Sequence, residues 1–407
     1  NKVYLNDINA HLILKEQPTN ISSKEACEEE GFKWVEEEGV CYSPGSIEED
    51  FTYSLVVEDL NLDGYSDYIA GNYMGQNKIY FGDGQGNFRL VQTLSSIDKT
   101  HSIAVADADL NGDGFPDFIV GNEGRNIIYL NNGLGKFYSY EESKEEDNTY
   151  SVAIGDLNGD GYQDYIAGNY GGESQPYYNL GEKECIKAMS KGFFWDSSKK
   201  TCYLRAGNRI YLNDGKGSFT LFVTGKEKDK TTAIAISDFN GDDYLDYVAG
   251  NYNDPNRVYL NDGKGNFTLS WLSKEKDKTL SIAVGDLNGD DYMDFIVGYD
   301  GLNRVYVNNG SGEFELLFSD FKKDKTYSIA IADFDNNGSL DYVAGNDGYN
   351  KIYINTGDGY FEFYARSAEV SKTRSVAVAE LLVYGETEEL CVYERKVITG
   401  KKDGEFY

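Results

Sequence analysis

The stretch Asp156-Leu157-Asn158-Gly159-Asp160-Gly161-Tyr162-Gln163-Asp164 is the strongest indication of the fold, because it occurs six times along the chain in recognisable form. Each copy places oxygen-bearing side chains at positions 1, 3, 5 and 9 of a tight turn, and the backbone carbonyl at position 7 adds another oxygen. Ca²⁺ is a hard cation that takes six to eight oxygens at about 2.3–2.6 Å. The spacing therefore predicts about six bound Ca²⁺ ions.

The predicted metal ligands occupy equivalent places in all six copies. They are Asp59, Asn61, Asp63, Tyr65, Asp67; Asp109, Asn111, Asp113, Phe115, Asp117; Asp156, Asn158, Asp160, Tyr162, Asp164; Asp238, Asn240, Asp242, Tyr244, Asp246; Asp286, Asn288, Asp290, Tyr292, Asp294; and Asp333, Asp335, Asn337, Ser339, Asp341. The sixth copy has Asn337 at position 5, so we expect its site to be no stronger than its neighbours.

Position 6 of the loop needs a residue that tolerates a left-handed backbone. Gly64, Gly114 and Gly161 meet this need. Asp243 and Asp291 replace glycine in two copies, and Asp is one of the few other residues that adopt this conformation.

Two alternatives compete with this interpretation. An EF-hand needs a Glu at position 12 and a helix on each side, but position 12 here is Ala70, Val120 or Ala167, inside a short apolar run that is typical of a buried strand. A metal-free turn of Asn, Asp and Gly is the second alternative. Turn chemistry alone does not require Asp at position 9 in six copies.

The six loops begin at residues 59, 109, 156, 238, 286 and 333, and all but one spacing lies between 47 and 50 residues. Periods of about 40–50 residues with several short strands are typical of propeller blades. Within residues 279–320 an apolar inner strand precedes the loop, and two further strands and an Asn-Gly turn lead to a fourth strand. Such turns are strong hairpin signals, so each repeat predicts a four-stranded antiparallel meander.

The predicted fold class is all-β, a seven-bladed β-propeller over residues 1–407 with the calcium loops between strands 1 and 2 of each blade. A threonine-led inner strand marks each blade, at Thr52, Thr100, Thr149, Thr231, Thr279, Thr326 and Thr373. The expected blades are 51–98, 99–147, 148–229, 230–277, 278–324, 325–371 and 372–407, with insertions at 17–50 and 171–207.

Residues 1–16 form an additional half-blade, because residues 2–5 match third strands elsewhere and residues 11–14 match fourth strands. The last blade has its own candidates for these strands at 396–399 and 404–406. An unpaired strand edge is a template for association. We therefore expect the half-blade to pair with a neighbouring molecule, slightly in preference to closure within the chain.

Taken together, these features resemble the FG-GAP/VCBS repeat family, which includes the propeller head of integrin alpha subunits. The resemblance rests on the nine-residue loop, on the apolar-Gly-Asn segment that follows it, such as Ile166-Ala167-Gly168-Asn169, and on the Asn-Asp-Gly-x-Gly-x-Phe hairpin. It covers nearly the whole chain apart from the two insertions. It implies a calcium-binding propeller, in a family whose members serve as adhesion heads, surface proteins and carbohydrate-active modules.

Four of the five cysteines fall into two similar pairs. Cys27 and Cys41 bracket a Gly-Phe-Lys-Trp segment, and Cys185 and Cys202 bracket a Gly-Phe-Phe-Trp segment. A disulfide that closes a loop of about 15 residues contributes about 3 kcal/mol. Zinc is the alternative, but His11 and His101, the two histidines, lie outside the insertions.

We favour disulfides, which imply an oxidising compartment and hence an extracellular or cell-surface location. For Cys391, in a predicted strand, a buried free thiol is preferred to an intermolecular bridge.

The chain is strongly acidic, with 69 Asp and Glu against 38 Lys and Arg and a net charge of −31. Such a surface repels phosphates, so nucleic acid is not an expected partner. The sequence contains no run of about 18 apolar residues, so no membrane span is expected in this chain.

Successive connections of an antiparallel meander alternate between two faces, so both insertions and the loops between strands 2 and 3 lie opposite the calcium loops. The candidate partner-binding residues on that face are Trp34, Trp195, Tyr73, Tyr170, Tyr252, Tyr299 and Tyr349. Packing of the tyrosines between blades is the alternative. We expect an adhesion or recognition module with a protein or glycan ligand. The alternative is a structural subunit that self-assembles into a filament or surface layer by strand donation.

An enzymatic function is not expected. The sequence shows no Ser/His/Asp arrangement and no phosphate-binding glycine loop, and neither histidine has an identifiable partner. The carboxylate pairs are accounted for as calcium ligands. A carbohydrate-active lyase or glycosidase built on tyrosines and acids is the remaining alternative.

Overall fold

The computed structural model describes residues 50–384 apart from 85, 107–108, 172–174 and 178–179. It also describes strands at 2–6, 12–15, 17–18, 33–35, 40–43 and 391–402, and residues 23, 24 and 27. The chain is all-β, with 59% strand and 3% helix, so the Asp-rich loops are not flanked by the paired helices of an EF-hand. No helix in the described part is long and apolar enough to cross a membrane.

The repeating element is a four-stranded antiparallel meander. In its simplest form β19 pairs with β20, β20 with β21, and β21 with β22. The Asp-rich loop joins the first two strands, and an Asn-Asp-Gly turn joins the last two. The second strand is buried at every residue of β20, because it lies in the middle of the sheet and both its faces are covered.

Six such units follow one another along the chain. Unit 1 contains β6 (Thr52–Glu58), β7 (Asp67–Gly82) and the first part of β8 (Phe88–Val105). Unit 2 contains the end of β8, β9 (Phe118–Gly124), β10 (Ile127–Asn131) and β11 (Phe137–Glu142). Unit 3 contains β12 (Asp147–Gly155), β13 (Asp164–Asn169), β17 (Arg209–Asn213) and β18 (Phe219–Thr224).

Units 4 to 6 follow the same order. Unit 4 contains β19 (Thr231–Ser237), β20 (Asp246–Asn251), β21 (Arg257–Asn261) and β22 (Phe267–Leu272). Unit 5 contains β23 (Thr279–Gly285), β24 (Asp294–Gly301), β25 (Arg304–Asn308) and β26 (Phe314–Ser319). Unit 6 contains β27 (Asp324–Ala332), β28 (Asp341–Asn355) and the first part of β29 (Phe361–Tyr384).

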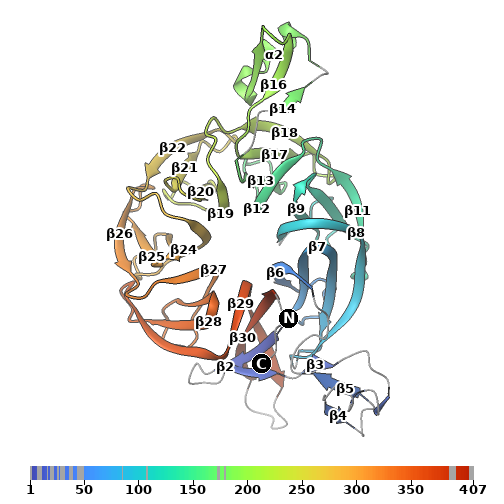
Figure 1. Ribbon diagram of the computed structural model, residues 1–407, viewed down its shortest axis with the longest axis vertical. Helices are drawn as coiled ribbons and strands as arrows, with labels where there is room; N and C mark the ends of the chain where they lie inside the picture. Colours follow the sequence, from blue (N-terminus) through green and yellow to red (C-terminus); the bar gives the residue numbers. More distant parts are fainter. Residues whose placement is uncertain are drawn as a thin grey trace.

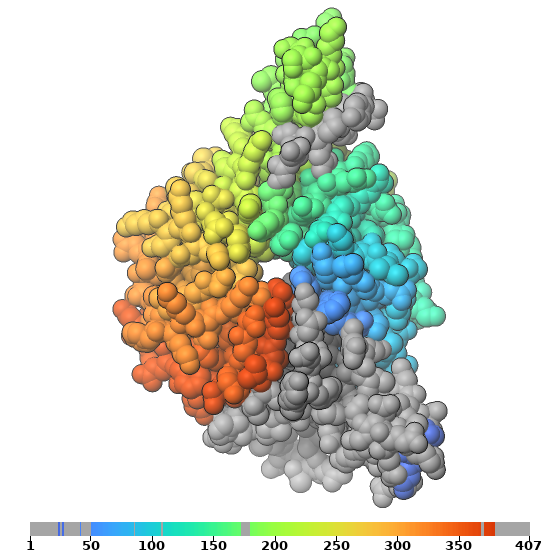
Figure 2. Space-filling model, in the orientation of Figure 1, coloured from blue at the N-terminus to red at the C-terminus, as the bar shows by residue number. Residues whose placement is uncertain are grey.

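The units stand around a central axis, with their first strands innermost (Figure 1), and an opening remains at the centre in the space-filling view (Figure 2). Adjacent units share their hydrophobic cores, since Ile69 of unit 1 and Phe118 of unit 2 belong to one cluster. Inner strands are also joined by serine hydroxyls that accept backbone N–H groups of the next unit, as from Ile103 to Ser54 at 3.0 Å.

The ring is closed by strands from both ends of the chain. The second part of β29 pairs with β30 (Cys391–Lys402), β30 pairs with β1 (Lys2–Asn6), and β1 pairs with β2 (Leu12–Lys15). We call these four strands the closing unit. The N–H of Leu55 donates to Ser375 Oγ at 3.0 Å and links unit 1 to this unit.

This closure corrects two predictions. Residues 396–399 were expected to form the third strand of the last repeat, but they lie within β30, which is its second strand. The half-blade at residues 1–16 was expected to pair with another molecule, but β1 pairs with β30 of the same chain, with Val3 opposite Ile398. The free edge of β30 explains the result. Its unpaired N–H and C=O groups form hydrogen bonds with the nearest matching strand, which is β1 of the same chain. The fourth strand predicted at 404–406 lies outside the described residues.

The two insertions have the same construction. The first contains β3 (Gln17–Pro18), β4 (Lys33–Val35) and β5 (Val40–Ser43); the second contains β14 (Gln175–Tyr177), α2 (Glu182–Lys187), the 3₁₀ helix η1 (Met189–Lys191), β15 (Phe193–Asp196) and β16 (Thr201–Leu204). Their strand orders, β3-β5-β4 and β14-β16-β15, are equivalent. Both predicted disulfides are present, Cys27–Cys41 and Cys185–Cys202.

The registers of the two insertions also agree. Trp34 lies opposite Cys41, and Trp195 lies opposite Cys202. The second insertion extends outward beyond the rim of the ring (Figure 1), so it does not simply stand on the face opposite the Asp-rich loops, where both insertions were expected.

Candidate metal centres and recognition face

The first Asp of each loop organises the turn. Asp156 Oδ1 accepts the N–H of Gly159 at 2.8 Å and its Oδ2 accepts the N–H of Gly161 at 2.9 Å. Asp243 takes the place of Gly161 in the fourth loop with a φ of 67°, and its N–H donates to Asp238 Oδ2 at 2.8 Å. The left-handed conformation predicted at position 6 is therefore present in an aspartate as well as in glycines.

The last Asp of each loop is fully buried and holds the loop to its own sheet. Asp164 Oδ2 accepts the N–H of Leu157 at 3.1 Å, and its Oδ1 accepts the N–H of Asn213 at 2.8 Å. The six equivalent residues, each 0% exposed, are Asp67, Asp117, Asp164, Asp246, Asp294 and Asp341. Each carboxylate oxygen has a further lone pair, so these bonds leave capacity for a cation.

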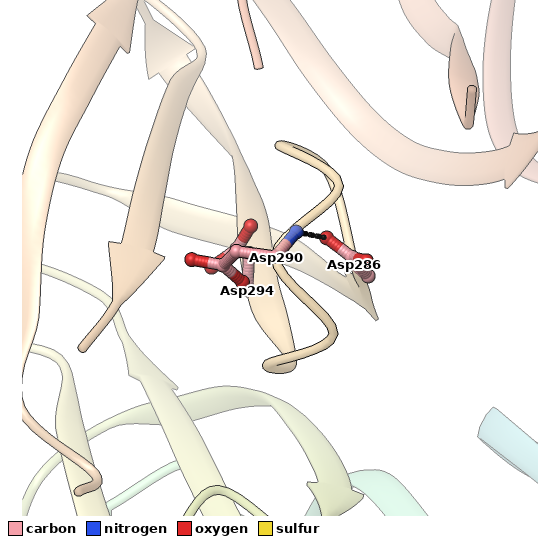
Figure 3. Close-up of side chains that lie close together, drawn as sticks. All are labelled: Asp286, Asp290 and Asp294. Atoms are coloured by element: carbon pink, nitrogen blue, oxygen red, sulfur yellow. Dashed lines mark hydrogen bonds between the residues drawn. The ribbon is translucent and has the colours of Figure 1, made fainter. Parts of the chain in front are cut away.

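Carboxylates converge at the centre of the loop. One oxygen from each of Asp286, Asp290 and Asp294 lies within 4.8 Å of the others (Figure 3). In the sixth loop Asp333, Asp335 and Asp341 make a group of the same size, with position 3 in place of position 5. The N–H of Asp290 donates to Asp286 Oδ1 at 3.2 Å and fixes the approach of the two side chains. All these donors are oxygens, which is the ligand type that hard divalent cations prefer.

The buried carboxyls have raised pKa values in the absence of a cation. Burial is the largest cause, and the carboxylates at positions 1 and 5 add to it in five loops, while those at positions 1 and 3 do so in the sixth. The pKa rises from 3.8 to about 7 for Asp67, Asp117 and Asp164, and to about 6 for Asp246, Asp294 and Asp341. A divalent cation would compensate this repulsion, so the residues present fit such an ion.

The side chain at position 7 packs over the hairpin of its own unit. A Cβ at Gly263 would come within 2.5 Å of the Tyr244 ring, and a Cβ at Gly215 would meet Tyr162 at 2.5 Å, so only glycine fits beneath each ring. In the sixth loop Ser339 replaces the aromatic ring, and a Cβ at Gly357 would stay 3.6 Å from its Oγ. The sixth loop is therefore less tightly enclosed than the others.

One set of residues beside the loops was missed by sequence reasoning. The asparagine that ends each third strand was interpreted only as part of a hairpin turn. In the structure Asn261 Nδ2 donates to the carbonyl of Leu157 in the preceding unit's loop at 2.9 Å and to Leu245 of its own loop at 3.0 Å. Equivalent bonds to the preceding loop start from Asn131, Asn213, Asn308 and Asn355.

These asparagines connect neighbouring loops around the ring. Unit 1 has Gly82 in this place, and the unit before it, the closing unit, has no Asp-rich repeat in its sequence. The sequence did carry a signal: the third strand ends in Asn in units 2 to 6, each of which follows a unit with an Asp-rich loop, and in Gly82 in unit 1, which does not.

The tyrosines predicted on the opposite face have different environments. Tyr73 stacks on Tyr53 at 4.9 Å, and Tyr170 lies 5.9 Å from Tyr252; all are half-buried. Arg366 lies over the ring of Tyr349 at 4.1 Å.

Tyr299 is a correction, because it is 2% exposed and belongs to a core cluster. Its hydroxyl accepts a hydrogen bond from Asn256 at 3.1 Å, so it serves packing and not recognition. Trp195 packs partly buried beside its disulfide. The side chains of Trp34 and Cys391 lie outside the described residues.

His101 also differs from the prediction, since it has a partner. Its Nε2 lies 3.2 Å from Glu123 Oε1, which also accepts the Tyr73 hydroxyl at 3.1 Å. Lys99 Nζ donates to Glu123 Oε2 at 2.7 Å. Burial lowers the pKa of His101 despite the opposing effect of Glu123. His11 lies outside the described residues.

A closed ring of antiparallel meanders, with a repeated Asp-rich loop in six of them, defines a protein of the propeller-like class. The model of the FG-GAP-like repeat matches residues 59–109, 109–167, 238–297, 286–344 and 333–381, which together make more than half of the chain. The protein belongs to the FG-GAP repeat family. No curated protein sequence matches it.

Solved structures with the same overall fold have little sequence in common with it. A lectin from Agrocybe aegerita, described as recognising non-reducing terminal N-acetylglucosamine, is 17% identical with a TM-score of 0.51, over 78% of this chain and 80% of that one. BBS1N in complex with ARL6DN is 10% identical with a TM-score of 0.52, over 85% and 92%. Sqt1 of Saccharomyces cerevisiae is 12% identical with a TM-score of 0.53, over 87% and 94%. These similarities show the fold alone.

Proposed function

We propose that the protein is a seven-bladed propeller, stabilised by about six Ca²⁺ ions, that recognises a protein or glycan through the face opposite its Asp-rich loops. The six units and the closing unit supply the seven blades. An FG-GAP repeat propeller fold suggests an interaction or recognition module, and structures of this shape include a sugar-recognising lectin and a protein complex. The proposed activity is binding and not catalysis.

The observation that carries the calcium proposal is the burial of a carboxylate at position 9 beside two others, six times over. Burial of a charge is unfavourable unless the charge is compensated, and a cation at the centre of each loop would favour the ionised form of these carboxyls. Calcium suits the loops better than magnesium, because Mg²⁺ requires near-ideal octahedral geometry and retains its water, whereas Ca²⁺ accepts irregular sets of carboxylate and carbonyl oxygens.

The proposed location is extracellular or at a cell surface. The two disulfides support it, because such bonds persist in oxidising compartments. The candidates that remain for partner binding on the face opposite the Asp-rich loops are Trp34, Trp195, Tyr73, Tyr170, Tyr252 and Tyr349. Strand donation to a neighbour is not proposed, because β1 already pairs within the chain.

Melting with and without chelator tests the calcium proposal. Ligands that bind only the native state stabilise it by mass action, so treatment with EDTA should lower the melting temperature by many degrees, and added Ca²⁺ should restore it. Elemental analysis of the untreated protein should find several calcium ions per chain. An unchanged melting curve together with an absence of metal would show that the loops are turns without an ion.

A further inference from the structure

The first residue after the buried threonine of each inner strand lies in a β-bulge. The register of the first two strands shifts at this point in every unit, for example between Thr52 and Ser54 and between Thr149 and Ser151. A bulged residue has no partner across the ladder, and its side chain is re-aimed. The bulged residues are, in chain order, Tyr53, His101, Tyr150, Thr232, Leu280, Tyr327 and Arg374.

Five of these side chains form a continuous row of contacts, which we call the axial collar: Tyr327, Arg374, Tyr53, His101 and Tyr150. The Arg374 guanidinium lies 3.8 Å from the Tyr327 ring centre and 4.9 Å from that of Tyr53. His101 lies 5.5 Å from Tyr53 and stacks on Tyr150 at 3.9 Å. Because each contact joins a different pair of units, the collar runs along the innermost strands. Its residues stand at the start of these strands and the Asp-rich loops follow their ends, so the collar lies at the end of the axis opposite the loops.

The collar ends where Thr232 and Leu280 replace the large side chains, and half-buried rings from the neighbouring loops flank this sector. Tyr170 stacks on Tyr150 at 4.5 Å, and Tyr252 follows it. Lys230 Nζ lies 5.4 Å from the Tyr170 ring, and Lys278 Nζ lies 5.7 Å from the Tyr252 ring. The mouth of the opening therefore presents ring edges, phenol hydroxyls and ammonium groups together.

The charge at this mouth differs from that of the whole molecule, which is −31. Six cations border it, Lys99, Lys230, Lys278, Lys325, Lys372 and Arg374, against Glu123, Asp300 and Asp347, the last of which pairs with Lys372. Lys99 pairs with Glu123 and Lys278 with Asp300. Among the described residues, Lys230, Lys325 and Arg374 have no ion-pair partner. The mouth is thus locally positive, while the six clusters of aspartates lie at the other end of the axis.

We propose that this mouth binds a carboxylate-bearing saccharide, such as a chain of uronic acids; the proposal rests on the recognition function proposed above and names its ligand. Aromatic edges and phenol hydroxyls suit the alternating CH and OH surface of a sugar ring, and the unpaired ammonium and guanidinium groups suit its carboxylate. The acidic remainder of the surface directs an anionic ligand to this end by repulsion.

An acidic peptide is the main competitor, because it carries the same charge. Peptide recognition uses an exposed sheet edge, a groove for a helix, or pockets for side chains. A cavity between units 3 and 4 is lined by Asp229, Thr231 and Arg257, beside Lys230 of the mouth, and it holds only a water-sized space. A cavity of this size cannot admit a peptide side chain, whereas the rings and cations of the mouth can contact a sugar ring from outside, which favours the saccharide.

The test uses the full calcium-loaded chain and isothermal titration with three probes of equal length. These are a hexamer of galacturonic acid, a neutral hexamer of glucose, and a hexaglutamate peptide. The acidic sugar should bind, with an affinity that falls as salt rises from 50 to 300 mM, and the other two probes should bind at least tenfold more weakly. Equal binding of hexaglutamate would overturn the saccharide class, and no binding of the acidic sugar would overturn the proposal.

Matched variants locate the site. Lys230→Ala with Lys325→Ala, and separately Tyr252→Ala, should each weaken binding of the acidic sugar at least tenfold. Lys136→Ala with Lys216→Ala removes the same charge from exposed hairpins at the opposite end, and Tyr138→Ala removes a half-exposed ring from β11; both should bind as the unaltered protein does. Loss in the controls, or none in the mouth variants, would place binding elsewhere. The EDTA melting curve of each sample separates a failure of the calcium proposal from a failure of this one.

Discussion

Asp98 and Asp147 stand two residues before the buried threonine of their inner strands, yet only Asp147 meets a cation. Arg209, whose side chain is fully buried, donates from Nη2 to Asp147 Oδ1 at 2.8 Å. The same pairing joins Asp50 to Lys78, Asp229 to Arg257, Asp277 to Arg304 and Asp324 to Lys351. In unit 2 the cation is replaced by Ile127, and Asp98 Oδ2 is buried without a hydrogen-bond partner.

Substitution of these two aspartates should therefore have very different effects. Asp147→Ala leaves the buried Arg209 charge without its partner, which costs about 3–5 kcal/mol. Asp98→Ala removes a carboxylate that has no cation partner, so no buried charge is left uncompensated. It should change the free energy of unfolding by less than about 1 kcal/mol. Chemical denaturation of the calcium-loaded proteins measures both values. Similar losses in the two variants would mean that the ion pair contributes little.

His101 contributes to the pH dependence of stability, and its share can be measured in the calcium-loaded protein by comparison with a variant at this position. Glu123, Lys99 and Arg374 are the charged groups around it, and Tyr53, Tyr73 and Tyr150 are the neighbouring rings. Burial lowers the pKa of His101 in the folded protein below the value of about 6.5 expected when unfolded. The unfolded state therefore binds the proton first, and stability that is complete above pH 6.5 is lost as the pH falls through the folded pKa.

Replacement of the imidazole by a ring that does not titrate should remove this loss. His101→Phe keeps an aromatic side chain between Tyr53 and Tyr150, so the stack remains. Between pH 7.5 and pH 5 the unaltered protein should lose more melting temperature than His101→Phe. Parallel decreases in the two proteins would show that other groups carry the pH dependence.

At the scale of the elements, the third strand of each unit supports two loops at once. Asn261 contacts Leu157 of the preceding loop and Leu245 of its own, and its backbone N–H donates to Asp246 at 2.7 Å. The two loops that Asn261 joins are therefore mechanically connected, although their residues are about 80 positions apart in sequence.

Asn261→Ala should weaken calcium binding at both loops and lower the free energy of unfolding by about 2 kcal/mol, because two buried carbonyl groups lose their donor. Calcium titration should show two sites of reduced affinity, and not one. Asn266→Ala is the matched control, since Asn266 lies in the same hairpin but bonds only to Asp262. One weakened site, or an equal effect of the control, would contradict the connection.

The elements that sequence could predict are those determined by local chemistry. The spacing of aspartates, the Asn-Gly turns and the cysteine pairs each act over fewer than 20 residues, and the structure contains the corresponding loops, hairpins and disulfides. The pairing of β30 and the contact between His101 and Glu123 were not predictable in this way. A strand of the pattern Lys-Val-Ile-Thr fits either the second or the third place in a sheet, and only its neighbours decide.

At the scale of the whole molecule, the ring depends on the pairing of β1 with β30. Val3 and Ile398 are directly opposite each other. The double variant Val3→Cys with Ile398→Cys should therefore form a disulfide within one chain, and the product should have the mass of a monomer under non-reducing conditions. Disulfide-linked dimers as the main product would restore the strand-donation model. Val3→Cys alone is the control for random oxidation.

The pairing of β1 with β30 also sets a minimum time for closure of the ring during synthesis. Chains emerge during synthesis at about 5–20 residues per second, so residues 2–6 wait about 20–80 s for residues 396–399 to appear. During this interval the six units can form in order, because each is completed by its own hairpins. Over the same time β1 lacks its partner strand β30. The ring can therefore close only after β30 has been made, however early the units between the two strands have formed.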